Sequence, residues 1–471
     1  MDWLVARAES GSSGLRRTLG PVSLGALGVA TIVGAGIFVL AGDAAGQHAG
    51  PAVTISFLLA GLAAGASALC YAEMASMLPV SGSSYSYAYA VLGVLAGWVV
   101  GWCLLLEYLI GGAAVAAGWG GYVNNVLSGI GIDLPDAVLG GPFGGGGIIN
   151  APAVVIVCAV VALLVTGVRE SARATNVLVA MKVGVLLVFV GVGAFYVTAG
   201  NLTPFVPDNT GTFGDFGWSG VLRAAALVFF SYVGFDAVCT AAQEAHDPRR
   251  TVPIGVLGAV VIASVLYIAV AFVMTGMVSY TKLVSPDALS VALSSVPRLE
   301  WLERTMDIIA TLALGATVLA TMYAQSRILV RMAEDGLLPD RLRRVDPRSG
   351  TPRAATFLCG VACAVLAALV PLATLGELIS AGTLLAFTFV CAGLLVLRRS
   401  DPDLPRGFRV PGGPVIPLAA IGVNIVLVAM IPLSSLVRVA VWLVIGLCVY
   451  LAYGRTRAAR LLAEHTQGAP A

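Results

Sequence analysis

The feature that most constrains this chain is a series of long apolar runs, each able to cross a bilayer as a helix. A transmembrane helix needs roughly 20 predominantly apolar residues. Runs of about that length fall at 22–42, 51–77, 86–115, 151–168, 176–199, 219–242, 252–277, 305–330, 354–372, 376–397, 414–432 and 436–454. We therefore predict an all-α integral membrane protein with about twelve transmembrane helices.

The composition agrees with a membrane location and excludes several functional classes. Only 11% of the 471 residues are charged, against roughly 25% in soluble domains. A net charge of +2 gives nucleic-acid binding no electrostatic basis. The eight cysteines and three histidines show no metal-ligand spacing, and no nucleophile–base pair or soluble catalytic domain marks an enzyme. We expect neither a metal nor an organic cofactor.

The basic residues indicate the orientation of the helices. With these spans, five of the 27 lysines and arginines fall on one side and Lys182 falls within a span. The remainder lie on the side that carries both termini, and basic residues accumulate on the cytoplasmic side of membrane proteins. We therefore predict a multi-pass protein of the cytoplasmic (inner) membrane with both termini in the cytoplasm. The five residues placed outside are Arg223, Lys282, Arg298, Arg304 and Arg438.

The first span contains two glycines at its centre, in the stretch Ala30–Phe38. Gly34 and Gly36 permit non-helical dihedrals, so the helix is expected to unwind there. Unwound backbone at membrane depth is tolerated only beside a cavity or within protein, and the N–H groups that begin the second half-helix form a site for a carboxylate. The alternative is a close helix–helix contact through small residues.

A second break is expected in the sixth span, in the stretch Ala226–Val238. Ser231, Gly234 and Asp236 fall together in the middle of this apolar segment. An acid at membrane depth is costly and indicates a functional site. Asp236 can also be explained as the N-cap of the second half-helix, and both roles can hold together.

Breaks in the first and sixth spans are typical of an inverted five-helix repeat with a substrate site at the membrane midplane. One break offers N–H groups to an anion, and the other offers the carbonyls of Phe230, Ser231 and Val233 to a cation. Together they suit a zwitterion with a carboxylate and an ammonium on one carbon, which indicates an amino acid. Phe229 and Phe230 could cover the substrate or pack against the first helix.

These residues resemble the amino acid–polyamine–organocation superfamily, most closely its cationic amino acid transporter branch. The matching stretches, which cover nearly the whole chain, are 32–38, 71–79, 229–236, 244–253 and 325–329. The resemblance implies a leucine-transporter-type fold. Its parts would be a cytoplasmic N-terminal segment (1–21), a first five-helix repeat (22–200), an inverted second repeat (201–400), two additional helices (401–455) and a cytoplasmic tail (456–471).

The resemblance also implies a secondary active transporter that works by alternating access. The substrate carboxylate would meet the N–H groups of Ala35, Gly36 and Ile37, and its amine would meet the carbonyls of Ile32, Phe230, Ser231 and Val233. The leading function is proton-coupled import (symport) of an L-amino acid, small neutral or cationic. The alternatives are an amino acid or polyamine exchanger, a facilitator, or a membrane sensor or enzyme.

Lys182 in the fifth span has two interpretations. It could extend to the cytoplasmic edge of the membrane, or it could bind and release a proton because burial disfavours its charged form. In proton-coupled members of the resembled family, a lysine of the fifth helix occupies the place of a sodium ion. A proton is therefore the expected coupling ion, and Lys182 is the candidate residue.

Two residues predict different substrate sizes. Glu107 in the third span would favour a cationic side chain if it lies in the pocket, or it could be a protonated acid bonded to nearby backbone. Met322 in the eighth span is either core packing or a pocket residue that leaves room only for a small side chain. Glu73 and the turn at 79–84 are expected to be structural or part of a gate. A small membrane subunit and a homo-oligomer both remain open as partners.

Overall fold

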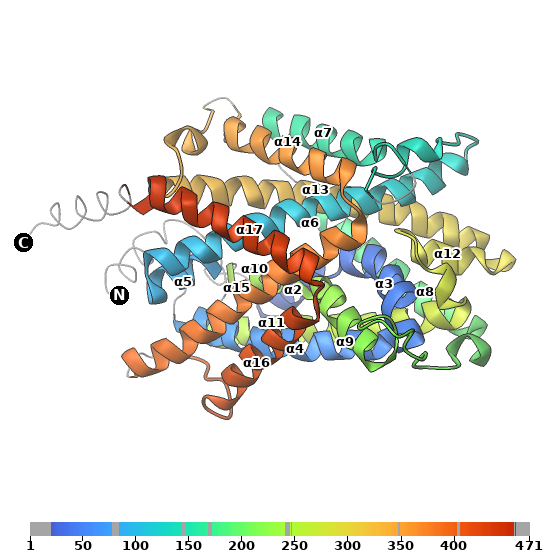
Figure 1. Ribbon diagram of the computed structural model, residues 1–471, viewed down its shortest axis with the longest axis horizontal. Coiled ribbons are helices and arrows are strands. Elements are labelled where there is room, and N and C mark those ends of the chain that lie inside the picture. Colours follow the sequence, from blue (N-terminus) through green and yellow to red (C-terminus); the bar gives the residue numbers. More distant parts are fainter. Residues whose placement is uncertain are drawn as a thin grey trace, which may run out of the picture.

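The computed structural model describes residues 20–77, 84–143, 147–167, 172–240, 245, 247–346, 349–402, 406–455 and 457. Within these ranges the chain is mostly helical and contains no strand, although isolated bridges occur, among them one between Leu139 and Asn150. The long helices lie roughly along the longest axis of the molecule, with connecting segments gathered at its two ends (Figure 1). The predicted all-α fold is confirmed.

The α-helices are bounded as follows: α2 (Pro21–Ile32), α3 (Ala41–Asp43), α4 (Val53–Met77), α5 (Ser84–Leu92), α6 (Val94–Ser128), α7 (Ala151–Thr166), α8 (Ala172–Gly193), α9 (Gly217–Val228), α10 (Asp236–Thr240), α11 (Pro248–Met277), α12 (Ala288–Ser294), α13 (Glu300–Glu334), α14 (Arg353–Leu369), α15 (Leu372–Ser400), α16 (Val415–Met430) and α17 (Leu433–Val449). Short 3₁₀ or π segments extend or interrupt them, among them η1 (Gly36–Leu40), η2 (Ala44–Ala49), η7 (Phe229–Tyr232), η11 (Asp340–Arg343) and η12 (Tyr450–Gly454).

Each predicted apolar run corresponds to helical structure. Among the described residues, seven stretches are long and apolar enough to cross a membrane, and the first of them, Pro21–Met77, contains two of the predicted spans. Three shorter apolar helices, α7, α14 and α16, fall on further predicted spans. The sixth predicted span is divided among α9, η7 and α10.

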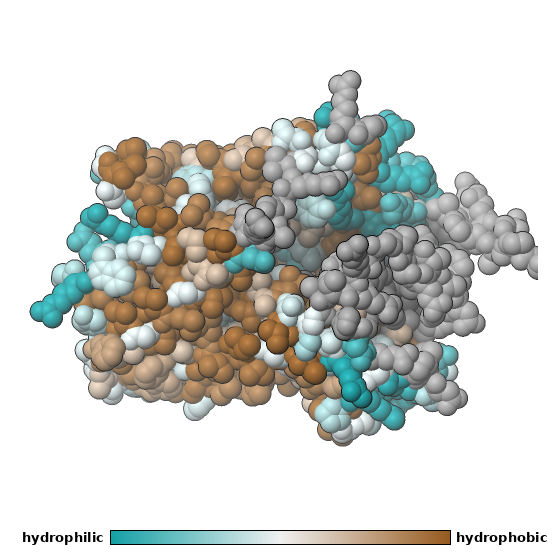
Figure 2. Space-filling view, turned by 180° about the vertical axis from the view of Figure 1, so that it is seen from behind, coloured by the Kyte–Doolittle hydropathy of each residue, from teal (hydrophilic) through white to brown (hydrophobic). Residues whose placement is uncertain are grey.

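The outer surface of the molecule is suited to lipid. In Figure 2 an apolar band crosses the middle of the visible face, and hydrophilic residues gather toward the two ends. Large apolar side chains such as Val155, Leu187 and Val265 are exposed on the surface of the molecule. In water, many exposed apolar side chains would be unfavourable. The helices therefore present apolar side chains outward as well as inward, as a bilayer requires.

Polar networks fasten both ends of the helical bundle. At one end the Glu73 carboxylate accepts hydrogen bonds from Arg398 Nε at 2.9 Å and from the Val410 N–H at 2.7 Å, and Arg406 lies 3.5 Å away. Glu73 therefore joins α4 to the segment between α15 and α16, in agreement with its predicted structural role. The predicted turn at 79–84 lies outside the described residues except for Ser84.

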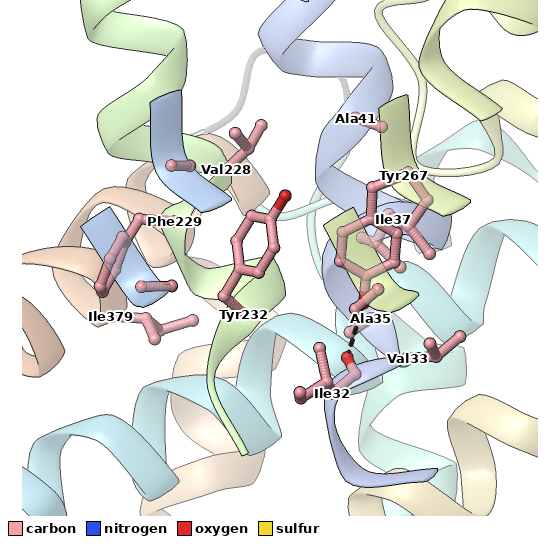
Figure 3. Close-up of a cluster of buried hydrophobic side chains, with 14 of the residues drawn as sticks. Ile32, Val33, Ala35, Ile37, Ala41, Val228, Phe229, Tyr232, Tyr267 and Ile379 are labelled. Carbon is pink, nitrogen blue, oxygen red and sulfur yellow. Dashed lines mark hydrogen bonds between the residues drawn. The ribbon is translucent and has the colours of Figure 1, made fainter. Parts of the chain in front are cut away.

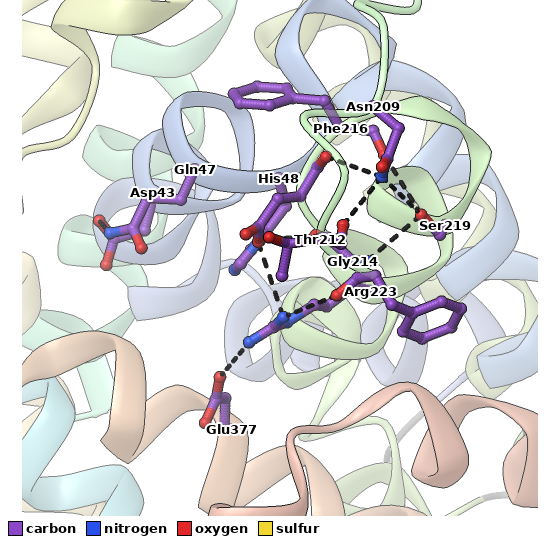
Figure 4. A network of polar contacts seen from close by, with 12 residues as sticks. Asp43, Gln47, His48, Asn209, Thr212, Gly214, Phe216, Ser219, Arg223 and Glu377 are labelled. Atoms are coloured by element: carbon purple, nitrogen blue, oxygen red, sulfur yellow. Dashed lines mark hydrogen bonds and ion pairs between the residues drawn. The ribbon is translucent and has the colours of Figure 1, made fainter.

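At the other end a second network, drawn in Figure 4, joins the segment after the first span to α9 and α15. His48 Nδ1 lies 3.1 Å from the Gly214 carbonyl, and Arg223 lies 3.7 Å from both Asp215 and Glu377. These contacts tie together elements far apart in the sequence. The predicted terminal segments fall largely outside the described residues, as do 241–244 and His246 of the matching stretch at 244–253.

Candidate functional site

The first span is broken at the predicted place. Helix α2 ends at Ile32, and Val33 is extended, with ψ of 95°. The chain then resumes as the π-helical segment η1 from Gly36. Residues 33–35 thus separate two half-helices in the middle of the span, and the predicted unwinding at the glycines is confirmed.

The sixth span is broken in the same manner. Helix α9 ends at Val228 and passes through the 3₁₀ turn η7 into Val233, which is extended with ψ of 137°. Gly234 then adopts φ of +117°, a conformation that side chains other than glycine rarely accept. Helix α10 begins at Asp236, which agrees with the predicted place of the second half-helix.

The two breaks contact each other. The Thr31 hydroxyl donates a hydrogen bond to the Gly234 carbonyl at 2.9 Å. A Cβ atom placed on Gly36 would lie 2.2 Å from Ser231 Oγ and 2.3 Å from Ser231 Cα, so the approach requires glycine. Both interpretations of the glycine-containing stretch therefore hold: the helix unwinds, and it makes a close small-residue contact.

A tyrosine that was not among the predicted site residues bridges the two breaks. The hydroxyl of Tyr267 in α11 lies 2.7 Å from the Ile32 carbonyl and 3.0 Å from the Ser231 carbonyl. Figure 3 shows Tyr267 beside Ile32, with Tyr232 on the neighbouring segment, and the hydroxyl of Tyr232 donates elsewhere, to Phe57. The sequence feature that could have indicated this role is the position of Tyr267 within an apolar helix, where its hydroxyl needs a hydrogen-bond partner.

A cavity of about 510 Å³ lies where the two breaks meet. Its walls are mostly apolar, and Lys182 and Asp236 are the charged side chains among the described residues that line it. Seven of the predicted site residues are in its lining: Ile32, Ala35, Gly36, Lys182, Phe230, Val233 and Asp236. The cavity thus combines an apolar wall with main-chain groups from both unwound segments.

Two predicted backbone contributors lie just behind the cavity wall. Ile37 is fully buried within η1, and Ser231 is buried against Gly36. The Ser231 hydroxyl has no hydrogen-bond partner among the described residues. Neither residue lines the cavity.

The two residues that predicted different substrate sizes, Glu107 and Met322, also do not line the cavity. Glu107 is buried, and its carboxylate accepts a hydrogen bond from the Thr383 hydroxyl of α15 at 2.9 Å. The Met322 side chain is buried on the far side of α13, where a Cβ on Gly360 of α14 would lie 3.6 Å from its Cε. This geometry supports the core-packing interpretation of Met322. It places the Glu107 carboxylate in a contact between helices.

The opposite face of α13 forms much of the cavity wall. Its lining residues recur every three or four positions and are mostly small, which leaves room for a ligand: Ala313, Ala316, Thr317, Leu319, Ala320, Thr321 and Ala324. This face was not among the predicted site residues. Its signal, alanine and threonine repeated at helical spacing, also occurs at ordinary helix contacts.

Lys182 reaches into the site from α8. Its Nζ donates a hydrogen bond to the Ala30 carbonyl at 2.5 Å, and the side chain is 7% exposed. It therefore lies against α2, one turn before the break, and does not extend toward the membrane edge. No group of three histidine, cysteine, aspartate or glutamate residues able to hold a metal occurs in the described ranges.

This arrangement can bind a small dipolar molecule. The start of η1 brings the positive end of a half-helix to the cavity, and η7 with the extended residue after it brings the carbonyls of Phe230 and Val233. An apolar wall on α13 faces these groups.

Comparisons with known proteins agree with this geometry. Residues 19–452 match the model of the "Amino acid permease" family. The chain is 42% identical over 452 residues to the branched-chain amino acid permease BcaP of Bacillus subtilis (strain 168), covering 95% of both chains. It is 40% identical to the methylthioribose transporter of the same organism, also over 95% of both chains.

A plant relative agrees with the resemblance drawn from the sequence motifs. The vacuolar cationic amino acid transporter 4 of Arabidopsis thaliana is 38% identical over 84% of this chain and 65% of its own length. These relatives are named as transporters, not enzymes, and the described part of this chain carries the membrane-spanning helices of such a protein. The chain therefore belongs to the amino acid permease family of the amino acid–polyamine–organocation superfamily and is a multi-pass membrane protein.

Proposed function

We propose that this protein imports a neutral L-amino acid with a short or branched apolar side chain, driven by a proton gradient, by alternating access. The observation that carries the proposal is the cavity at the meeting point of the two broken spans. The relative named as a branched-chain amino acid permease supports the substrate class. The distribution of basic residues supports a cytoplasmic membrane location with both termini inside.

The main-chain groups at the breaks would hold the amino acid backbone. The substrate carboxylate would accept hydrogen bonds from the N–H groups of Ala35 and Gly36 at the start of η1. Its ammonium would donate to carbonyls of Ile32, Phe230 and Val233, three residues that line the cavity. Ile32 already accepts from Tyr267, and the second lone pair of its carbonyl remains for the substrate.

The cavity wall on α13 would set the side-chain preference. Alanines such as Ala316 and Ala320 leave space without offering a charge, and Glu107 is engaged by Thr383 instead of lining the cavity. Burying a lysine or arginine head group against this face of α13, which carries no acid among its lining residues, would be costly. The α13 wall therefore suits an apolar side chain better than a cationic one.

Lys182 would couple the proton to transport. With a proton, its ammonium donates a charge-assisted hydrogen bond to the Ala30 carbonyl and holds α2 against α8. Without the proton, the neutral amine makes a weaker bond, so α2 is released to move with the first break. A proton bound from outside and released inside would then drive one transport cycle.

The experiment is uptake by purified protein in liposomes. Radiolabelled leucine, alanine, arginine and methylthioribose are each tested with and without an inward proton gradient. We expect leucine or alanine to accumulate only with the gradient. Accumulation of arginine or methylthioribose alone would contradict the proposed substrate class, and gradient-independent exchange would favour the exchanger or facilitator.

The role of Lys182 is tested in the same liposomes. Lys182→Ala is expected to abolish gradient-driven accumulation. The matched control is Lys282→Ala, which removes an exposed lysine from the connection between α11 and α12 and is expected to keep wild-type uptake. Full gradient-driven accumulation by Lys182→Ala would contradict the proposal that Lys182 couples proton movement to transport.

A further inference from the structure

A second cavity, remote from the transport site, lies on the outer side of the bundle between α6 and α17, which cross in Figure 1. It has a volume of about 220 Å³ and is lined by Trp98, Val99, Trp102, Leu443, Val444 and Leu447, the set we call the tryptophan groove. Val444 and Leu447 are 59% and 44% exposed, so the groove is open to the surrounding bilayer. Its lining is entirely apolar.

The tryptophans of the groove are held rigidly by their own hydrogen bonds. Trp98 Nε1 donates to the Gly446 carbonyl at 3.0 Å, and Trp102 Nε1 donates to the Trp442 carbonyl at 2.8 Å. Trp442 returns a bond to the Trp102 carbonyl at 3.0 Å, and the rings of these two residues stack with centroids 4.6 Å apart. Because every indole N–H is already used, the groove presents only ring faces and edges, which suit a hydrocarbon chain.

A basic cluster lies beyond η12, which continues α17, where the chain meets η11. Arg341, Arg343, Arg344 and Arg455 are exposed there. The acid among them, Asp340, lies 2.9 Å from Arg343 and is also bonded by Arg457. Arginines therefore outnumber acids in this cluster, and it can bind a phosphate.

The groove and the basic cluster belong to one continuous surface. Leu447 of the groove, Leu451 in η12 and Arg455 follow one another at four-residue spacing, and all three are exposed. Just beyond, Arg457 bonds Asp340 of η11, which brings the arginines of η11 to the same end of the helix. From Leu447 to Arg455 the helical rise is about 12 Å, within the reach of one lipid molecule from acyl chain to head group.

We propose that the tryptophan groove and this basic cluster form a binding site for an anionic phospholipid. One acyl chain lies along the indoles of α6 and the apolar face of α17, and the phosphate and its anionic head group lie among the arginines. A second copy of this chain is a poorer occupant, because it would add a further arginine cluster at the same face of the membrane. A free phosphate would leave the groove unfilled.

The experiment uses purified full-length protein in phosphatidylcholine nanodiscs. Phosphatidylglycerol with dibrominated acyl chains is titrated in, and tryptophan fluorescence is recorded. Bromine quenches tryptophan only at contact, so a lipid in the groove quenches strongly. We expect quenching to saturate at a low mole fraction of the brominated phosphatidylglycerol. Brominated phosphatidylcholine at the same fraction should quench at least threefold less.

Two pairs of variants test the two halves of the site. Val444→Phe fills the groove and is expected to remove the saturable quenching, whereas Val437→Phe, on an exposed face of the same helix outside the groove, is expected to keep it. The double variant Arg344→Gln/Arg455→Gln should abolish the preference for phosphatidylglycerol. Its control, Lys282→Gln/Arg298→Gln, removes two exposed charges from other connections and should leave the preference intact.

Two outcomes overturn the proposal. The first is equal quenching by both brominated lipids at low and at high salt, which would indicate ordinary annular lipid. The second is absence of saturable quenching together with a dimer, seen by native mass spectrometry, that Val444→Phe dissociates. That result would assign the groove to a second copy of the chain.

Discussion

Replacing Gly36 with alanine tests whether the contact between the two breaks is required. The added Cβ would lie 2.2 Å from Ser231 Oγ, 2.5 Å from Ser231 Cβ and 2.3 Å from Ser231 Cα. The hydroxyl could rotate away, but the Cα atom belongs to the backbone of η7 and cannot. The two unwound segments must therefore move apart.

The size of the effect follows from these distances. Ordinary contacts begin at 3.4 Å, so the Gly36 and Ser231 backbones must separate by about 1.1 Å. Overpacking of this kind costs about 1–3 kcal/mol, and each 1.4 kcal/mol corresponds to a factor of about ten. The same displacement moves carbonyls of both breaks away from one another. We expect a loss of about fivefold to a hundredfold in uptake at low substrate concentration, with a lower thermal midpoint.

The assay is initial uptake of radiolabelled leucine in liposomes, with thermal unfolding in detergent measured in parallel. The control is Gly258→Ala in α11, where an added Cβ meets nothing within 4 Å. Alanine at this helical position should keep the stability or raise it, because glycine is the poorer helix former. Wild-type uptake and thermal midpoint in Gly36→Ala would refute the close contact of the two breaks.

Two further predictions concern single side chains. Tyr267→Phe removes the hydroxyl that bridges the Ile32 and Ser231 carbonyls, so we expect about 1–3 kcal/mol of destabilisation and a raised KM for uptake. Its control, Tyr232→Phe, should lose similar stability without the change in KM, because its hydroxyl bonds Phe57 at 2.8 Å instead, and equal KM values in the two variants would argue against the bridge. Met322→Ala should lower stability by about 2–5 kcal/mol by leaving a void beside Gly360, while a competition panel of amino acids stays unchanged. Wider acceptance of long side chains by that variant would place Met322 in the substrate path.

The sequence by itself determined the fold class and the positions of both breaks. Apolar runs of spanning length are a local signal, because each run must satisfy its own backbone as a helix in lipid. The breaks are also local: Gly34 and Gly36 in one span, and Gly234 and Asp236 in another, interrupt otherwise apolar helices. The observed ends of α2 and α9 and the start of α10 follow from those residues.

Only the tertiary structure decided which side of each helix faces the cavity. In a soluble protein the polar face of a helix shows which side faces solvent. A membrane helix such as α13 has apolar residues on most of its sides, so its sequence does not show which side faces the cavity. Met322 thus lies away from the cavity while Thr321, its neighbour, lines it. Tyr267 bridges the two breaks because α11 packs across both. Tyr267 and Ile32 are more than 200 positions apart in the sequence, so no local pattern could predict their contact. The local pattern locates unwound backbone, whereas helix rotation depends on the packing of all neighbouring helices at once.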